Sequence, residues 1–334
     1  MNIDSLKKTF HNKRILITGG MGLLGSNLAR LLLPTGAIIT VIDNFSPKYG
    51  ANKFNLHDIQ NEITTVIADI GDAGIINKLV CEVDYIFNFA GQSSHIYSMV
   101  NPLSDLDGNL RAQLTLLEAC RKFNPKVKIF FSSTRQVYGI PEQLPVDENH
   151  KLAPIDINGH HKLLAEEYHN LYYKHYGIRS VIFRLTNTYG PGMRVKDGLQ
   201  NFLGLWIRQT LENEAIQVFG DGKQIRDFNH VEDVLDAILT SASMATAYGQ
   251  TYNLGNDTFY TLTEIAELMI TITGTGRIEY IPFPKHRKAI DIGNYYANTR
   301  KIKQKIQWEP HLKFPEGLEK VLSFYKKNQN QYFS

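Results

Sequence analysis

The chain has 334 residues, of which 43% are hydrophobic and 21% are charged, and this composition is ordinary for a globular protein. Its net charge of +3 is spread along the chain without long basic runs, so nothing favours nucleic acid as a partner. No apolar run approaches the ~20 residues that cross a bilayer, and the N-terminus lacks the apolar stretch of a signal peptide. The two cysteines, Cys81 and Cys120, have neither the spacing of a metal site nor that of a disulfide framework. We therefore expect a cytoplasmic protein that binds no nucleic acid, no membrane and no metal.

In the first half of the chain, short β-rich runs alternate with helical patterns. Strands are predicted at 14–18, 37–42, 63–68, 85–89, 128–131 and 180–184. Helices are predicted at 25–33, 101–123 and 159–176. Strands that alternate with helices indicate a parallel sheet with right-handed crossovers, and continuously apolar strands indicate that both faces are covered. The predicted fold is therefore α/β, with a Rossmann-type doubly wound parallel sheet.

The sequence pattern changes after the last of these strands. Loops lengthen, and proline and glycine cluster. This change predicts a smaller, discontinuous C-terminal lobe made of residues 186–224 and 257–334. The larger domain would comprise residues 1–185, with 225–256 returning to it. We expect the lobe to lie over the carboxyl edge of the sheet, where open α/β sheets bind their ligands.

A glycine-rich turn follows the first predicted strand and opens a helix. Gly19, Gly22 and Gly25 have the spacing G-x-x-G-x-x-G. Glycine allows a tight turn and a close approach of the backbone to a pyrophosphate, whose charge then lies at the helix N-terminus. Asp43 ends the second strand, at a spacing from the turn that suits hydrogen bonds to a ribose diol. The turn and Asp43 together predict a dinucleotide site.

The residues around Asp43 also indicate which dinucleotide is bound. A carboxylate at this position repels a 2′-phosphate, and the next residue is Asn44 rather than an arginine that would reverse the preference. We therefore expect NAD rather than NADP. Asp69, after the third strand, would either accept a hydrogen bond from the adenine amino group or serve only as a strand-end loop residue.

Further motifs follow the glycine turn along nearly the whole chain. They are FAGQ at 89–92, Asn109 with LLEA at 116–119, SSTRQVYG at 132–139, RLTNTYGP at 184–191, RDFNHVEDV at 226–234, Arg287 ahead of Asp291, and WEP at 308–310. With the glycine turn, these motifs resemble the extended short-chain dehydrogenase/reductase family. Within that family they are similar to the NAD-dependent nucleotide-sugar epimerases and dehydratases.

The resemblance implies a cofactor site, a substrate site and an assembly. The implied NAD contacts are Gly19, Gly22, Leu23, Leu24, Gly25, Asp43, Asn44, Asp69, Ile70, Ala90, Gly91, Gln92, Asn109 and Lys162. The implied nucleotide-sugar contacts are Ser94, Arg135, Asn187, Arg226 and Arg287, the last three at the diphosphate. Arginine suits that place because its guanidinium binds phosphate through two hydrogen bonds. The family also implies a homodimer formed through the helices at 101–123 and 159–176.

One catalytic residue of this family is missing. Its members carry Tyr-x-x-x-Lys, in which the tyrosine takes the hydroxyl proton while NAD takes a hydride from the same sugar carbon. Lys162 is present here, but Asn158 occupies the tyrosine position, and an amide does not titrate. Asn158 could still hold a sugar hydroxyl or a water molecule. Thr134 keeps the position of the catalytic Ser/Thr.

Three explanations for Asn158 remain open. Another residue could act as the base, and His161 is the first candidate because it lies three residues further along the same helix. His95, after the fourth strand, is a second candidate. Alternatively the reaction is altered, or the chain binds NAD and a nucleotide-sugar without catalysis.

The two residues after Thr134 bear on the reaction. The family's 4,6-dehydratases carry an acidic pair there, whereas this chain has Arg135 and Gln136, which cannot eliminate water as acid and base. The favoured prediction is therefore an NAD-dependent nucleotide-sugar epimerase that acts by transient oxidation of the sugar. A dehydratase or another sugar-modifying lyase is the runner-up, and a non-enzymatic binding protein stays open. Arg135 would recognise a carboxylate or phosphate on the substrate, or form an ion pair on the surface.

Overall fold

A seven-stranded parallel sheet forms the centre of the computed structural model, which describes residues 3–46 and 49–333. Its strands lie in the order β10-β6-β5-β4-β1-β2-β3. Their bounds are β1 (Arg14–Thr18), β2 (Ile38–Asp43), β3 (Thr64–Ile67), β4 (Tyr85–Asn88), β5 (Lys128–Thr134), β6 (Arg179–Leu185) and β10 (Thr251–Leu254). The predicted Rossmann-type fold is confirmed. Strands β1 to β6 lie where the sequence predicts strands, whereas β10 is an additional edge strand that the sequence pattern does not predict.

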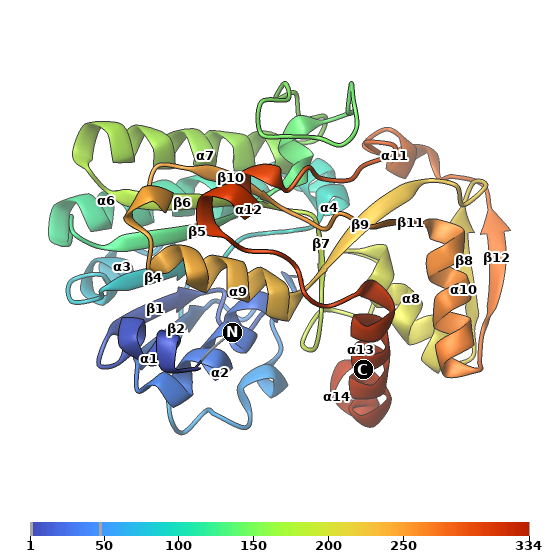
Figure 1. Ribbon diagram of the computed structural model, residues 1–334, viewed down its shortest axis with the longest axis horizontal. Coiled ribbons are helices and arrows are strands. Elements are labelled where there is room, and N and C mark those ends of the chain that lie inside the picture. Colours follow the sequence, from blue (N-terminus) through green and yellow to red (C-terminus); the bar gives the residue numbers. More distant parts are fainter. Residues whose placement is uncertain (1–2, 47–48, 334) are drawn as a thin grey trace.

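Helices cover both faces of this sheet (Figure 1). One face packs against α1 (Ile3–Phe10), α2 (Leu23–Leu32), α9 (Val231–Ala242) and α12 (Arg300–Ile306). The other face packs against α3 (Ala73–Leu79), α6 (Ala112–Phe123) and α7 (Ile157–Tyr176). The helix predicted at 101–123 consists of α5 (Pro102–Leu106), the π-helical turn η4 (Asp107–Arg111) and α6. The helix predicted at 159–176 is α7.

Strand β3 departs from the prediction that every strand is covered on both faces. It lies at the edge of the sheet, and its residue Ile67 is 58% exposed. The other edge strand, β10, is mostly buried, so this exposure belongs to β3 and not to edge strands in general.

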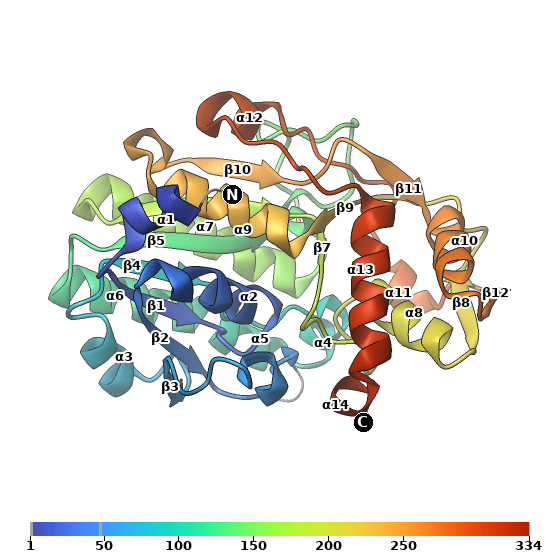
Figure 2. The ribbon, with the colours of Figure 1, turned by 60° about the horizontal axis from the view of Figure 1, so that its bottom comes forward.

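A second hydrophobic core lies beyond the carboxyl edge of the sheet (Figure 2). The elements of the lobe around it are β7 (Asn187–Tyr189), α8 (Phe202–Leu211), β8 (Ala215–Phe219), β9 (Ile225–His230), β11 (Phe259–Thr261), α10 (Leu262–Thr273), β12 (Arg277–Ile281), α11 (Lys285–Lys288), α13 (Phe314–Lys327) and α14 (Gln329–Tyr332). Helix α12, which the sequence analysis assigns to this lobe, instead packs on the first core through Ile302 and Ile306. The remaining short elements are α4 (His95–Val100), η1 (Leu33–Thr35), η3 (Lys53–Leu56), η5 (Arg135–Tyr138) and η6 (Ala245–Ala247).

The strand order creates a crevice at the carboxyl edge. From β1 the chain moves outward through β2 and β3, and then returns to β4 on the other side of β1. The loops that leave β1 and β4 therefore diverge, and a crevice opens between them, which is where open α/β sheets bind ligands. Within residues 3–46 and 49–333, no helix is long and apolar enough to cross a membrane.

Candidate functional site

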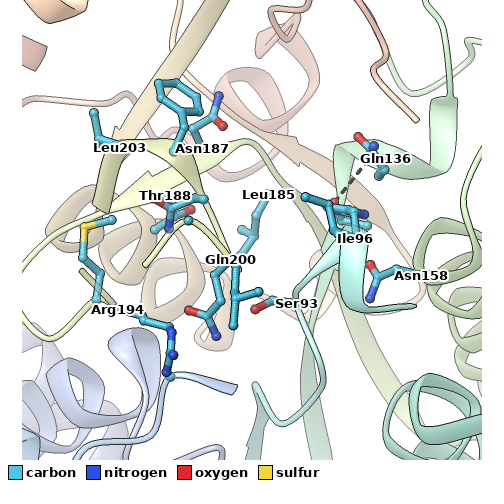
Figure 3. Close-up of a pocket in the computed structure, with 18 of the residues that line it drawn as sticks. Ser93, Ile96, Gln136, Asn158, Leu185, Asn187, Thr188, Arg194, Gln200 and Leu203 are labelled. Carbon is cyan, nitrogen blue, oxygen red and sulfur yellow. Dashed lines mark hydrogen bonds between the residues drawn. The ribbon is translucent and has the colours of Figure 1, made fainter. Parts of the chain in front are cut away.

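A cavity of about 560 Å³ lies at this crevice, between the sheet edge and the C-terminal lobe. Figure 3 shows its two walls: Gln136 and Asn158 come from the large domain, and Asn187 and Leu203 come from the lobe. The glycine turn after β1 and the loop after β4 form part of the same wall. Residues that are far apart in the sequence therefore meet around one space.

The charged side chains on the walls of the cavity are mostly cationic. Apart from His95, the charged side chains among its described lining residues are Arg135, Lys162, Arg194, Arg226 and Arg287 and the carboxylate of Asp291. A concave surface with an excess of one charge attracts ligands of the opposite charge. The cavity is therefore suited to an anionic ligand.

The glycine turn needs glycine at two of its three positions. Gly19 has a φ of +66°, and a Cβ there would lie 2.9 Å from the Ala90 nitrogen. A Cβ on Gly25 would lie 2.3 Å from the Gly19 carbonyl oxygen. Gly22 has more space, and as the N-cap of α2 it has no side chain to accept a hydrogen bond. The first N–H groups of α2 thus lack a side-chain acceptor, and a pyrophosphate would supply one.

Asp43 lies beside this turn. Its Oδ2 accepts a hydrogen bond from the Met21 nitrogen and its Oδ1 accepts one from the Phe45 nitrogen, both at 2.9 Å. Burial raises the pKa of the Asp43 carboxyl above its ordinary value, although these two hydrogen bonds oppose the shift. Each carboxylate oxygen can accept a second hydrogen bond, so Asp43 keeps acceptor capacity for a ribose. Leu23 and Leu24, the first residues of α2, line the cavity.

The remaining candidates at the adenine end lie close to one another. Asn44 Nδ2 donates to Asp69 Oδ2 at 2.8 Å, and Asp69 Oδ1 accepts from the Gly71 nitrogen at 2.7 Å. Ile70 is buried in the core between the sheet and α3. These residues and Asp43 are not among the described residues that line the cavity, so any contact with a cofactor would lie at its margin.

The loop after β4 meets α7 at the cavity. A Cβ on Gly91 would lie 2.5 Å from Asn109 Oδ1 and 3.1 Å from Lys162 Nζ, so a side chain there would displace the ends of these two side chains. Lys162 Nζ donates to the Ser132 carbonyl at 3.1 Å, and burial lowers the pKa of Lys162 to about 8, although nearby carboxylates oppose the shift. Asn109 Oδ1 is buried without a hydrogen-bond partner in the described part of the chain. It is therefore an acceptor that a bound cofactor could satisfy.

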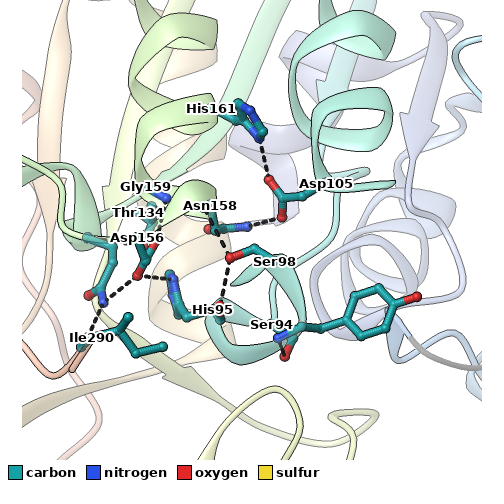
Figure 4. Close-up of polar contacts among 12 residues, drawn as sticks. Ser94, His95, Ser98, Asp105, Thr134, Asp156, Asn158, Gly159, His161 and Ile290 are labelled. Atoms are coloured by element: carbon teal, nitrogen blue, oxygen red, sulfur yellow. Dashed lines mark hydrogen bonds and ion pairs between the residues drawn. The ribbon is translucent and has the colours of Figure 1, made fainter. Parts of the chain in front are cut away.

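Asn158 lies near the start of α7, and hydrogen bonds from its side-chain nitrogen fix its position (Figure 4). Its Nδ2 donates to the Gln92 carbonyl at 2.8 Å and to Asp105 Oδ2 at 3.1 Å. The same carboxylate oxygen accepts from Gln92 Nε2 at 2.8 Å and from Asn109 Nδ2 at 3.0 Å. These bonds occupy both amide hydrogens of Asn158. Its Oδ1 is left as the atom that can accept a hydrogen bond from a ligand.

The two histidine candidates lie in different places. His161 Nδ1 lies 2.7 Å from Asp105 Oδ1, and His161 is not among the described residues that line the cavity. His95, at the start of α4, does line the cavity, and its Nδ1 lies 3.0 Å from Asp156 Oδ2. The structure therefore brings His95 to the cavity rather than His161, the first candidate from the sequence.

Thr134 and Ser94 both cap short helices. Thr134 ends β5 and lines the cavity, and its Oγ1 accepts from the Gln136 nitrogen at 3.2 Å. Ser94 Oγ accepts from the Tyr97 nitrogen at 3.2 Å. Ser94 is buried away from the described cavity wall, and its neighbour Ser93 lines the cavity instead.

The three residues expected at the diphosphate all line the cavity. They are Asn187, Arg226 and Arg287. The Arg226 guanidinium donates to two backbone carbonyls and forms an ion pair with Asp291 at 3.1 Å, so much of its hydrogen-bonding capacity is used within the protein. Arg287 is partly buried beside the Phe219 ring and has no ion-pair partner among the residues that the structure describes. Arg287 is therefore the freer of the two arginines.

Arg135 is not paired on the surface. Its guanidinium carbon lies 5.4 Å from the centre of the Tyr295 ring, and its buried Nε has no hydrogen-bond partner in the described chain. Burial lowers the pKa of Arg135, and the carboxylates of Asp227 and Asp291 oppose the shift from a distance. Arg135 thus adds an unpaired cation to the cavity wall.

Comparison with known proteins identifies the family. Residues 15–255 match the NAD dependent epimerase/dehydratase family. The chain belongs to this family. NAD is thereby confirmed as the cofactor, and so is the resemblance inferred from the motifs. Within the described residues, no group of three His, Cys, Asp or Glu side chains could hold a metal ion.

Individual relatives in this family differ in their reactions. UDP-glucuronic acid decarboxylase 1 of Xenopus tropicalis is 31% identical over 96% of this chain and 75% of that protein. CDP-paratose 2-epimerase of Salmonella typhi is 28% identical over 92% of this chain and 98% of that protein. The structure of UDP-glucose 4-epimerase from Thermotoga maritima with UDP-glucose superimposes with a TM-score of 0.86, at 28% identity, over 95% of this chain and 99% of that one. Membership fixes the class of chemistry and leaves the individual reaction to be assigned.

Sequence reasoning missed two buried carboxylates next to Asn158. Asp105 bonds the side chains of four candidate residues, and Asp156 contacts His95. Both left a signal in the sequence. Asp156 stands at an N-cap position two residues before Asn158, and Asp105 stands one helical turn before Asn109.

Proposed function

We propose that the protein is an NAD-dependent nucleotide-sugar epimerase. The sugar is oxidised at one carbon and then reduced from the opposite face, so there is no net redox change. Family membership supports the use of NAD and a nucleotide-linked substrate, and the choice of epimerisation rests on the residues of the cavity.

The observation that carries the proposal is a single cavity with two chemically different ends. One end holds Lys162, Asn158 and Thr134 beside the loop after β4. The wall contributed by the lobe holds Arg226 and the unpaired Arg287. A ligand that spans both ends would carry a diphosphate and a hydroxyl-bearing group, as a nucleotide-sugar does.

Each residue near Asn158 has a distinct use in this proposal. NAD, when bound, supplies the acceptor and donor of the hydride. Lys162 places a cation beside the cofactor loop, Thr134 offers a hydroxyl, and Asn158 offers its Oδ1 to a sugar hydroxyl or a water molecule. None of these three removes the hydroxyl proton as a phenolate would.

Epimerisation is favoured over elimination by the two residues after Thr134. Gln136 Nε2 donates to Asp156 Oδ2 at 3.0 Å, and Arg135 is a cation. Neither can exchange a proton near neutral pH, so the pair cannot supply the acid and base that eliminate water.

A nucleotide-sugar lyase is the second candidate, and one observation favours it. The unpaired guanidinium of Arg135 would bind a carboxylate on the sugar, such as that of a uronic acid. A relative of this chain is a UDP-glucuronic acid decarboxylase, whose reaction removes such a group.

Product analysis tests the proposal. The protein is incubated with NAD and one nucleotide-sugar at a time: UDP-glucose, UDP-glucuronic acid, or a CDP- or dTDP-linked hexose. The sugars are followed by proton NMR. We expect an epimer with no lasting accumulation of NADH. Loss of water or carbon dioxide would establish a lyase. Binding in calorimetry without turnover of any of these sugars would favour the non-enzymatic alternative.

We also propose a homodimer, because apolar side chains are exposed on the helices that the family resemblance implicates. On α6 and α7 these side chains are Phe123 (48%), Leu164 (42%), Leu171 (45%), Tyr173 (39%) and Tyr176 (49%). Leu103, on the adjoining α5, is 73% exposed. Exposed apolar side chains gathered on neighbouring helices indicate a protein interface.

A further inference from the structure

We propose that His95, oriented by the carboxylate of Asp156, is the general acid/base that takes the place of the missing tyrosine. This assignment rests on the proposed function, since it concerns the proton that leaves the sugar hydroxyl during transient oxidation.

The structure fixes His95 at the edge of the cavity. The residue begins α4, whose N-terminus is capped by Ser94, and Ser98 Oγ donates to the His95 carbonyl at 2.6 Å. The imidazole lines the cavity and its side chain is 28% exposed, so a substrate can reach it. Nδ1 lies 3.0 Å from Asp156 Oδ2, an ion-pair contact without hydrogen-bond geometry in the described chain, and Nε2 is left for a ligand (Figure 4).

Burial and hydrogen bonds fix the position of the Asp156 carboxylate beside His95. Its side chain is 0% exposed, it accepts a hydrogen bond from the Gly159 nitrogen at 2.6 Å as the N-cap of α7, and Gln136 Nε2 donates to it at 3.0 Å. Burial would raise the pKa of Asp156, but the contact with His95 and these hydrogen bonds hold it below its ordinary value. An ionised carboxylate beside Nδ1 favours a proton on that nitrogen. The lone pair of His95 Nε2 is then available to accept a proton.

Other groups around the cavity are less suitable as the base. His161 is bonded to Asp105 and is not among the described lining residues. Lys162 has a lowered pKa of about 8, so it is mostly protonated at neutral pH, and it donates to a backbone carbonyl. The charged groups on the elements nearest to His95 are Asp105 on α5, Arg135 on η5, and Asp156, His161 and Lys162 at the start of α7. Within the described chain, Asp156 is the one of these that contacts the His95 ring.

The proposed step balances in protons and electrons. When bound, NAD would accept the hydride from the C–H bond of the reacting carbon and later give it back. The sugar O–H bond breaks and its proton moves to His95 Nε2 as the carbon becomes a ketone. His95 returns the proton to oxygen when the carbon is reduced from its other face. Histidine suits both directions because it titrates near neutral pH.

The test compares the pH–rate profiles of four proteins with the nucleotide-sugar that wild type converts. They are wild type, His95→Gln, His161→Gln and His160→Gln, the last a control because His160 is exposed on α7. We expect His95→Gln to lose about 10²- to 10⁴-fold in rate, the range for removal of a general base, and to lose one titrating limb of the wild-type profile. His160→Gln should keep the wild-type profile.

Three further measurements separate a chemical role of His95 from a structural one. Calorimetry should show that His95→Gln still binds NAD and the nucleotide-sugar. Imidazole added to His95→Ala should restore part of the rate, because it refills the space with the same base. Asp156→Asn keeps an oxygen to cap α7, and it should lower the rate and shift the limb to lower pH.

The possible outcomes are distinct. A full-rate His95→Gln enzyme overturns the assignment and leaves the proposed function standing. Loss of the limb in His161→Gln, or a limb near 8 that disappears in Lys162→Met, also overturns it. A wild type that binds nucleotide-sugars without converting any of them overturns the proposed function, and the role of His95 falls with it.

Discussion

At the scale of single residues, Asn158 has a role that the sequence alone does not show. An amide in place of a phenol suggests a damaged active site. In the structure, however, both amide hydrogens of Asn158 are used, and they bond to Gln92 and to Asp105. Asn158 therefore helps to hold together the buried polar cluster beneath the cavity. In the proposed epimerase reaction, a residue other than Asn158 must carry the proton.

We predict that Asn158→Tyr does not raise activity on the native substrate. The residue is 2% exposed, so the larger ring must displace its neighbours, and a phenol cannot replace both amide hydrogen bonds. Overpacking of this kind lowers the free energy of unfolding by about 1–3 kcal/mol, which chemical denaturation would measure. Steady-state kinetics gives the decisive comparison. A variant faster than wild type would show that the site lacks only its tyrosine.

Arg287 supports a prediction about the substrate. Its guanidinium is unpaired in the described chain, so Arg287→Ala removes a phosphate partner and leaves no carboxylate behind. We expect a loss of about 1.5–3 kcal/mol, or roughly 10- to 150-fold in nucleotide-sugar affinity, with unchanged NAD affinity. Lys285→Ala, an exposed residue on the same short helix, is the matched control. Equal calorimetric affinities for wild type and Arg287→Ala would remove Arg287 from the site.

At the scale of elements, the sequence predicts the parts that repeat a simple pattern. Strands β1 to β6 are apolar runs between helical segments, and the glycine turn has a fixed spacing. Strand β10 is four residues of mixed polarity, TYNL, and it is recognisable as a strand only once it pairs with β6. The contact between His95 and Asp156 depends on how α4 packs against the start of α7. That packing joins segments about sixty residues apart, and no local pattern encodes it.

Strand β9 carries a buried carboxyl that makes stability depend on pH. Asp227 is fully buried, and burial raises its pKa to about 6, although Arg135 and backbone hydrogen bonds oppose the shift. Because the folded pKa exceeds the unfolded one, the folded state binds the proton more tightly. The stability that the folded state gains by binding this proton is complete at pH values below the unfolded pKa, near 4. It is lost as the pH rises through about 6.

Asp227→Asn should therefore remove part of the pH dependence of unfolding. Chemical denaturation at pH 4.5 and at pH 8 is the measurement. Relative to wild type, the variant should be more stable at pH 8 by up to about 3 kcal/mol, with a smaller difference at pH 4.5. Asp221→Asn, at an exposed turn, is the control. A variant that is equally destabilised at both pH values would contradict this account.

At the scale of the whole molecule, the exposed apolar side chains of α6 and α7 predict a dimer. Leu164→Glu places a charge among them and should convert the dimer to a monomer without loss of fold. Light scattering after size-exclusion chromatography would report the mass. Tyr280→Glu, an exposed apolar position in the C-terminal lobe, should leave the mass unchanged. A monomeric wild type would show that this surface has another use.

The measurement that tests the central claim most directly is proton NMR of the reaction run in D₂O with NAD. Transient oxidation moves the hydrogen of the reacting carbon to NAD and back, so the account predicts an epimer that carries no solvent deuterium at the inverted carbon. Deuterium at that carbon would show that it was inverted by deprotonation. A product that has lost water or carbon dioxide would show that the enzyme is a lyase. Either result would contradict the account.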